Sequence, residues 1–319
     1  MTDVTDPGYD FVPLAPDVRR VERAQACWDR HIAGTLAGYI DVTLTAEQPL
    51  HIGSGSKAAR PPHVVQRAAR ICDRPGIPGS SLKGVLRARY EAITRSCTSL
   101  FPGDRPVKIR SSTSSIRRAR LTSAVLEAAV LRSACDEKRT CPACALFGRM
   151  SLRSRITITD LAATSEAAFE PAFLPERFGP NLHHVGAVRV DASGEVFEVH
   201  RLRGRKFHLG RGPAAPTRQQ VEAIPAGTQL TGRIGVFNAT LAELGGLLTA
   251  LGNEPASALK LGGGKAHGFG RVRASARFAL HPSGAARVDP AHWRQAFIDS
   301  PDRWAEGEHR LIELHRGGC

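Results

Sequence analysis

Four of the seven cysteines stand at spacings suited to one metal ion. Cys141 and Cys144 form a Cys-x2-Cys pair, Cys135 lies six residues upstream, and Cys97 is the nearest candidate for the fourth ligand. Such a pair brings two thiolates to one tetrahedral Zn²⁺, and closure by four protein ligands makes a zinc site structural. A mixed site would need a distant histidine or Cys72. The alternative is that these cysteines are small buried residues or reactive thiols.

A glycine-rich segment, Leu261-Gly-Gly-Gly-Lys-Ala-His-Gly-Phe-Gly-Arg271, can bring backbone N–H groups close to a phosphate. It is not a P-loop, because alanine follows the lysine where a Mg²⁺-binding hydroxyl should stand. The other interpretation is a tight turn between a helix and a strand. The candidate phosphate contacts in this segment are Gly263, Gly264, Lys265, His267 and Arg271.

A second anion site is predicted where residues 75–87 change from a Pro/Gly turn into a helix. Ser80 or Ser81 is the expected N-cap, and the helix start offers backbone donors to an anion. Lys83 and Arg87, spaced i and i+4, share one face of this helix. Leu82, Leu86 and Ile93 form the opposite, apolar face.

The formal charge of +14 and the pI near 10.2 call for a polyanionic partner. Aromatic residues make up only 6% of the chain, which favours a surface that binds phosphates and sugars over one that stacks bases. A membrane surface is the weaker alternative, because no helix pattern sets lysine and arginine opposite a bulky apolar face. Basic residues gather in four stretches, at 57–74, 105–120, 149–155 and 201–211.

A catalytic site is harder to identify. No carboxylate lies between Glu47 and Asp73, and residues 54–74 are expected to form a long basic loop. His63, within that loop, could act as general base on a ribose 2′-OH, although a lone loop histidine is more often a polar contact. The other candidate RNA contacts of the loop are Lys57, Arg60, Arg67 and Arg70.

Interleaved strand and helix patterns indicate an α+β fold. Strands are expected at residues 39–50, 154–161, 228–238 and 272–280, and helices at 17–33, 121–131 and 241–251. Residues 1–38 are taken as an N-terminal extension, 174–207 as a protruding hairpin, and the tail after 278 as peripheral. The acidic N-terminus lacks the features of a secretory signal, no apolar run is long enough to span a membrane, and the odd cysteine count fits extracellular disulfides poorly. A cytoplasmic protein is expected.

Three motifs resemble the RAMP superfamily of CRISPR proteins, in particular the Cas7-like subunits of type III and related effector complexes. They are Ile77-Pro-Gly-Ser-Ser-Leu-Lys-Gly-Val-Leu-Arg87, Cys141-Pro-Ala-Cys-Ala-Leu-Phe-Gly148 and the glycine segment at 261–271. The resemblance spans residues 39–278 and occurs in the same motif order, which makes a chance match improbable.

The resemblance implies an RRM-like (ferredoxin-type) palm, a zinc-bearing insertion at about residues 97–148 and a thumb hairpin at about 176–225. It implies a subunit that holds guide crRNA and target RNA and assembles with other Cas subunits and with copies of itself or related RAMP subunits in a filament. Arg205 and Lys206 lie in Arg203-Gly-Arg-Lys-Phe-His208, a segment similar to one in some Cas7-like proteins, and join the candidate RNA contacts.

One departure from the family pattern concerns cleavage. Members that cut target RNA carry an aspartate in the loop before the Ile-Pro-Gly-Ser-Ser motif, and here that loop offers His63 and arginines, with no acid before Asp73. The expectation is therefore an RNA-binding subunit that does not slice. The alternative is an endoribonuclease that processes guide precursor or cuts target with His63 as base. A third reading is a zinc-containing RNA-binding protein unrelated to CRISPR.

Overall fold

The computed structural model describes residues 8–23, 28–61, 63–97, 107–110, 116–121, 135–136, 138–175, 186–190, 196–210, 219–253, 257–282 and 288–316. Within these ranges the chain is a mixed α+β structure built mostly from antiparallel sheets, which confirms the expected fold class.

The principal sheet has long central strands, because alternating apolar residues bury one face of each. In β3, Ile40, Val42 and Leu44 point inward, while Tyr39 and Asp41 lie on the outer face. The sheet order is β19 (Leu259–Lys260), β20 (Arg271–Pro282), β3 (Leu36–Ala46), β18 (Gln229–Ala239), β12 (Leu161–Ala163), β7 (Arg74–Ile77) and β6 (Arg70–Ile71), and β11 (Ile156–Ile158) also pairs with β18.

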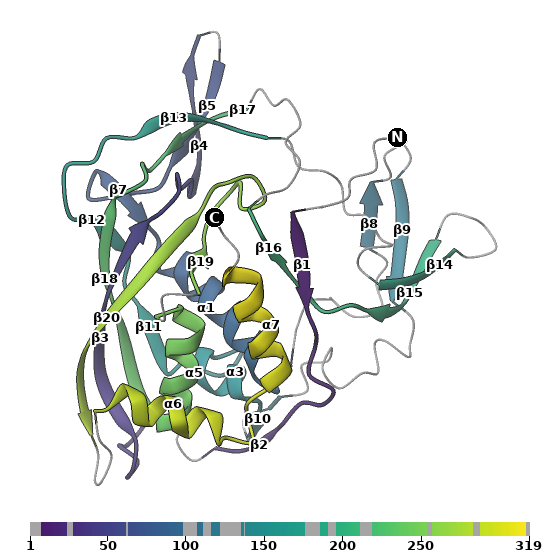
Figure 1. Cartoon of the computed structure of the whole chain (residues 1–319), viewed down its shortest axis with the longest axis vertical. Helices are drawn as coiled ribbons and strands as arrows, with labels where there is room; N and C mark the ends of the chain where they lie inside the picture. The colour runs from purple at the N-terminus through teal and green to yellow at the C-terminus, as the bar shows by residue number, and fades with distance from the viewer. Residues whose placement is uncertain are drawn as a thin grey trace.

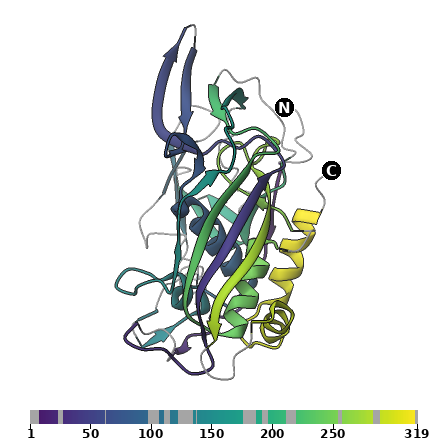
Figure 2. The same ribbon diagram turned by 90° about the vertical axis from the view of Figure 1, so that its left-hand side faces the viewer.

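Helices cover the inner face of this sheet and leave the outer face uncovered in the views of Figures 1 and 2. The helix α5 begins with a capping box between Thr240 and Glu243 and ends at Gly252, which adopts a left-handed conformation. Five helices are described: α1 (Gly79–Ile93), α3 (Pro142–Phe147), α5 (Leu241–Leu251), α6 (Pro290–Ile298) and α7 (Ala305–Arg316). None of these described helices is long and apolar enough to cross a membrane.

Smaller sheets extend from this body. One contains β13 (Glu170–Leu174), β17 (Gln219–Ala223), β5 (His63–Ala68) and β4 (Gly53–Arg60), and its β4–β5 hairpin projects at the top of Figure 1. Another contains β14 (Gly186–Val190), β15 (Val196–Leu202), β9 (Ile116–Leu121) and β8 (Val107–Arg110). Two strand pairs complete the description, β1 (Tyr9–Val12) with β16 (Arg205–His208) and β2 (Val21–Glu22) with β10 (Arg139–Thr140).

The predicted strands are confirmed with shifted ends and the helix at 241–251 with the ends expected, but two other expectations are wrong. The helix predicted at 17–33 is absent from the described part of that segment, where Val21–Glu22 forms a strand. The predicted loop at 54–74 forms the β4–β5 hairpin and two short strands instead. The helix predicted at 121–131 lies almost wholly outside the described residues.

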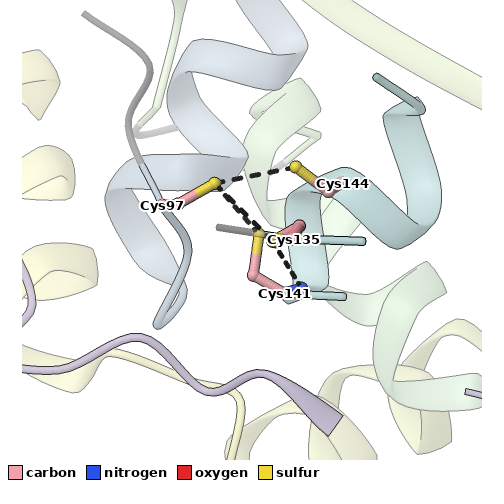
Figure 3. Close-up of side chains that lie close together, drawn as sticks. All are labelled: Cys97, Cys135, Cys141 and Cys144. Atoms are coloured by element: carbon pink, nitrogen blue, oxygen red, sulfur yellow. Dashed lines mark hydrogen bonds between the residues drawn. The ribbon is translucent and has the colours of Figure 1, made fainter. Parts of the chain in front are cut away.

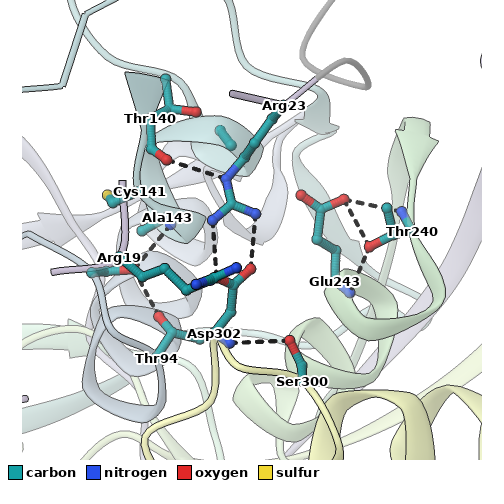
Figure 4. A network of polar contacts seen from close by, with 12 residues as sticks. Arg19, Arg23, Thr94, Thr140, Cys141, Ala143, Thr240, Glu243, Ser300 and Asp302 are labelled. Atoms are coloured by element: carbon teal, nitrogen blue, oxygen red, sulfur yellow. Dashed lines mark hydrogen bonds and ion pairs between the residues drawn. The ribbon is translucent and has the colours of Figure 1, made fainter. Parts of the chain in front are cut away.

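Side chains from distant parts of the chain hold the N-terminal segment in place (Figure 4). Arg23 donates to both carboxylate oxygens of Asp302, at 2.8 and 3.0 Å, and to the carbonyl oxygen of Thr140 at 3.2 Å. Arg19 pairs with the same aspartate at 3.2 Å. The segment before β3 is therefore tied both to the loop after α6 and to the residue that precedes Cys141.

The C-terminal segment is part of the core rather than peripheral, which corrects the sequence-based expectation. Trp293 and Phe297 of α6 and Leu311 of α7 are buried. Gly245 of α5 makes this packing possible, because a Cβ there would lie 2.1 Å from the carbonyl oxygen of Trp293. The helices after residue 289 therefore complete the layer that covers the principal sheet.

Candidate metal centre and nucleic-acid cleft

The four predicted cysteines converge on one buried point (Figure 3). The Sγ atom of Cys97 lies 3.9 Å from that of Cys135, 3.5 Å from that of Cys141 and 3.6 Å from that of Cys144. All four sulfur atoms lie within 4.8 Å of one another. A tetrahedral ion with metal–sulfur bonds of about 2.3 Å separates its sulfurs by about 3.8 Å. The spacing therefore fits a four-coordinate metal ion.

Local structure presents these thiols to each other. Cys141 precedes α3, Cys144 lies within that helix one turn later, and Cys97 follows α1. The backbone N–H of Cys141 donates to the sulfur of Cys135 at 3.3 Å. Hydrogen bonds from Cys141, Cys144 and Cys97 lower the pKa of Cys135, so the cluster favours thiolate formation there. The four buried cysteines could hold a metal ion.

Arg87 lies beside this cluster rather than on a free surface. Its guanidinium donates to the carbonyl oxygen of Gly148 at 2.9 Å and to Glu91 at 2.7 Å, and it lies 3.8 Å from the sulfur of Cys144. Glu91 also pairs with Arg205 of β16. A continuous polar chain therefore joins the cysteine cluster, α1 and β16.

A cleft of about 1230 Å³ lies on the other side of α1. It gathers residues from distant parts of the chain: β1, residues 51–53 at the start of β4, β5, the first half of α1, the end of β13, β16, the start of β17 and the glycine segment. Its polar lining residues are Tyr9, His51, Gln66, Ser80, Ser81, Lys206, His208, Gln219, Lys265 and His267. The described lining includes lysines and histidines but no carboxylate.

The glycine segment forms one wall of the cleft, and several of its positions have no room for a side chain. Gly262 has a φ of +78°, and a Cβ there would lie 2.3 Å from the carbonyl oxygen of His51. Gly263 donates to that same oxygen at 2.8 Å, and His267 donates to the carbonyl oxygen of Gly264 at 2.8 Å. The predicted tight turn is therefore present and lines the cleft, and contact of this segment with a phosphate stays a prediction.

The start of α1 differs from the expected cap. Pro78 is the N-cap residue and no side chain caps the helix in the predicted way, so Ser80 and Ser81 lie inside the first turn. Asp160 accepts from the N–H of Gly79 at 2.7 Å. Both serines nevertheless line the cleft.

β16 supplies a cation to the opposite wall. Lys206 packs with its ammonium 3.7 Å from the ring centroid of Tyr9, and burial lowers its pKa. Gly204 allows β1 to approach, because a Cβ there would lie 2.1 Å from the carbonyl oxygen of Val12. The N-terminal strand therefore helps to form the cleft, although the sequence indicated only an extension.

Other predicted RNA contacts lie away from the cleft lining. Lys83 and Arg87 are directed toward β11 and the cysteine cluster, and Arg205 pairs with Glu91. Arg70 pairs with Glu222, and Arg271 with Glu47. Lys57, Arg60 and Arg67 belong to the projecting β4–β5 hairpin.

His63 begins β5 opposite Arg60 at the tip of that hairpin, and its side chain lies outside the described part of the structure. Sequence reasoning missed His51 and His208, which line the cleft. His51 is buried, with Nδ1 2.7 Å from the carbonyl oxygen of Glu222.

The family model of the RAMP superfamily matches residues 43–273, well over half of the chain. The chain belongs to the RAMP superfamily. Both α1 and the glycine segment fall inside the matched range, as do all four clustered cysteines. No curated protein sequence matches this RAMP protein. Among solved structures it is similar to a chain of a "Type IV-B CRISPR Complex", with 18% identity, a TM-score of 0.37, and coverage of 82% of this chain and 100% of that one.

Proposed function

We propose that this RAMP protein is a Cas7-like subunit of a CRISPR effector complex that binds guide crRNA through its backbone. The observation that carries the proposal is the cleft, which brings the first turn of α1, the glycine segment and Lys206 together around one space. Helix starts and glycine-rich turns present backbone N–H groups, and lysines add charge, so such a cleft suits phosphodiesters. Target RNA, other Cas subunits and further copies of the chain are the proposed partners.

The strand order supports the proposed ferredoxin-type palm. Along the chain the palm elements run β3, α1, β12, β18, α5, β20, and in space the strands lie in the order β20, β3, β18, β12. The thumb is proposed to include the β14–β15 hairpin. For the cysteine cluster we propose Zn²⁺ in a structural role, because four buried thiolates without an open position match that ion best.

RNA binding to the cleft is expected to be electrostatic and largely indifferent to sequence. Replacing Lys206 and Lys265 with alanine should weaken all guide sequences about equally, since phosphate contacts position an RNA without reading it. Fluorescence anisotropy over a salt series measures this: for single strands, log K falls with log salt at about 0.7 per neutralised phosphate. Lys138→Ala, an exposed lysine outside the cleft, is the control. A slope near zero, or loss of binding that follows one base change, contradicts the proposal.

We further propose that the subunit binds target RNA without cutting it. In-line attack by a 2′-OH needs a positioned base and a proton donor, and arginine, which stays protonated at neutral pH, is a poor base. Histidines are the available titratable groups, at His51, His208 and His267 in the cleft and His63 on the hairpin. The residues before the Ile-Pro-Gly-Ser-Ser motif lack the aspartate that the resemblance associates with cutting, so purified complex should leave labelled target intact, in wild type and His63→Ala alike. Target cut at regular intervals, or precursor processing lost in His63→Ala or His208→Ala, favours the endoribonuclease alternative.

A further inference from the structure

The strands β20, β3 and β18 lie side by side in the principal sheet (Figure 2), and their register places polar residues of the outer face in rows that match across the three strands. Strand register places Arg277, Asp41 and Arg233 opposite one another on β20, β3 and β18. The next row contains only hydroxyl side chains, Ser275, Thr43 and Thr231, and the row after it contains Arg273, Thr45 and Gln229. Rows on one face lie about 6.6–6.8 Å apart along a strand. Short side chains are thus flanked by long cationic ones.

This difference in side-chain length makes a groove of about 690 Å³ over the hydroxyl row. Thr43, Thr231 and Ser275 line it, and Arg233 and Arg277 stand along one side. The hydroxyls donate hydrogen bonds and the guanidiniums donate charge-assisted ones. The groove is therefore lined by several donors to an anion and by one carboxylate, that of Asp41, which pairs with both arginines.

The arginines of the groove remain able to bind such an anion. Asp41 lies 2.8 Å from Arg233 and 3.9 Å from Arg277, so one carboxylate serves two cations, and the Arg277 side chain is 88% exposed. Glu47 likewise serves both Arg271 and Arg273. The four arginines and two carboxylates of this face leave a net positive charge.

An exposed aromatic ring lies one row beyond Arg277. Tyr39 is 51% exposed, and the guanidinium of Arg233 lies 4.9 Å from its ring centroid. Its cross-strand neighbours are Ala279 and Gly235, whose small size leaves space beside the ring. Aromatic rings next to basic grooves stack nucleobases with little regard to sequence.

We propose that this sheet face is a second nucleic-acid site, which binds the phosphodiester backbone of a single strand along the hydroxyl groove with a base against Tyr39. Charge complementarity and the donor-lined groove favour a nucleic acid over a protein partner. A stable protein interface has a dry apolar centre, and Tyr39 is the one large exposed hydrophobic residue that the described part of this face offers. The site is separate from the cleft, which is built from other residues.

The test is photo-crosslinking of the full-length protein to a short 5-iodouridine-substituted oligouridylate, with the crosslinked residues mapped by mass spectrometry. Wild type should crosslink at Tyr39. Arg277→Glu should lower the yield there roughly tenfold, because it reverses a charge at the groove edge. Thr43→Val should lower it several-fold without changing the net charge. Arg316→Glu, an equal charge change on the exposed end of α7, should leave the yield unchanged.

Variants of the cleft separate this proposal from the function proposed above. Lys206→Ala with Lys265→Ala should reduce crosslinks in the cleft and spare the one at Tyr39. Crosslinks confined to the cleft in wild type, or a Tyr39 crosslink that Arg316→Glu weakens as much as Arg277→Glu does, overturn the second site while leaving cleft binding intact. Competition by polyglutamate as strong as that by unlabelled oligouridylate would assign the face to an acidic protein partner and also overturn it.

Discussion

Gly264 occupies a position in the glycine segment that only glycine fits. Its φ is +70°, and a Cβ there would lie 2.6 Å from Cδ2 of Leu174 and 3.0 Å from Cβ of Phe269. Gly55, on the projecting hairpin, also has a positive φ, +85°, but has no heavy atom within 4 Å of its Cβ position. Alanine substitutions at these two glycines therefore distinguish the free-energy cost of the left-handed backbone from the additional cost of the steric clash.

We predict that Gly264→Ala lowers both stability and RNA affinity, whereas Gly55→Ala lowers stability only by the cost of the backbone conformation. Both substitutions cost about 1–2 kcal/mol for the left-handed conformation, and Gly264→Ala adds overpacking worth about 1–3 kcal/mol. Urea unfolding together with anisotropy of a labelled RNA measures the two effects. Equal losses for both variants would show that the wall of the cleft tolerates a side chain at residue 264.

At the scale of single residues, the sequence was informative where chemistry requires a local spacing. The grouping of Cys97, Cys135, Cys141 and Cys144 is confirmed, because a metal site limits how far apart its ligands can lie in the fold. The direction of Arg87 could not be predicted in the same way. A helix pattern gives the face on which a residue lies, but the neighbours of that face, here Gly148 and Glu91, come from the tertiary structure.

At the scale of helices and strands, too, local patterns were predictable from the sequence and tertiary contacts were not. The helix at 241–251 was predictable from Thr240 with Glu243 three residues later and from the glycine that follows it. The helix prediction at 17–33 was wrong because the apolar residues there have helical spacing, whereas the contacts of the segment are with remote parts of the chain. Arg23 binds Asp302, and Val21 pairs with Thr140. Long-range pairing overrides local periodicity, and a single sequence does not reveal it.

A buried ion pair joins two of these elements. Arg155, which precedes β11, contacts Glu243 at the start of α5, and their side chains are 0% and 4% exposed. Burial by itself would raise the pKa of Glu243, but the charge and hydrogen bonds of Arg155 and the N–H of Thr240 lower it overall. A lowered pKa in the folded state stabilises the protein above the unfolded pKa of about 4.3, and this contribution is lost as pH falls through the folded value.

We predict that Glu243→Gln costs about 3–5 kcal/mol at neutral pH, because it leaves the Arg155 guanidinium buried without its counter-ion. The variant should also lose less stability on acidification than wild type, since the titrating carboxylate is gone. Denaturant unfolding at a series of pH values measures both effects. Glu313→Gln, in an exposed pair with Arg310, should cost at most about 1 kcal/mol. Equal costs for the two variants would contradict the buried-pair account.

At the scale of the whole molecule, one polar chain links the cysteine cluster to the cleft. It runs from the sulfur of Cys144 to Arg87, from there to Glu91, and on to Arg205, which neighbours the cleft residue Lys206. Helix α1 supports the same link, because its first turn lines the cleft and Cys97 follows its last turn. A change at the cysteines can therefore reach both walls of the cleft.

We predict that one Zn²⁺ is bound per chain, and that its removal loosens the cleft as well as the cysteine cluster. Elemental analysis should show the loss of zinc in Cys141→Ser/Cys144→Ser. Chelation of wild type should speed amide hydrogen exchange in residues 205–208 and weaken RNA binding.

Two variants test the polar chain itself. Arg87→Ala should lower zinc affinity about tenfold, because loss of a residue that supports metal ligands commonly weakens metal binding by that factor. Glu91→Gln should reduce the effect of chelation on residues 205–208. Because linkage is reciprocal, saturating RNA should in turn tighten zinc binding by the same factor by which zinc tightens RNA binding. Full zinc content in the double cysteine variant would refute the metal assignment. Unchanged exchange at 205–208 after complete zinc loss would instead leave the metal centre in place and remove its connection to the cleft.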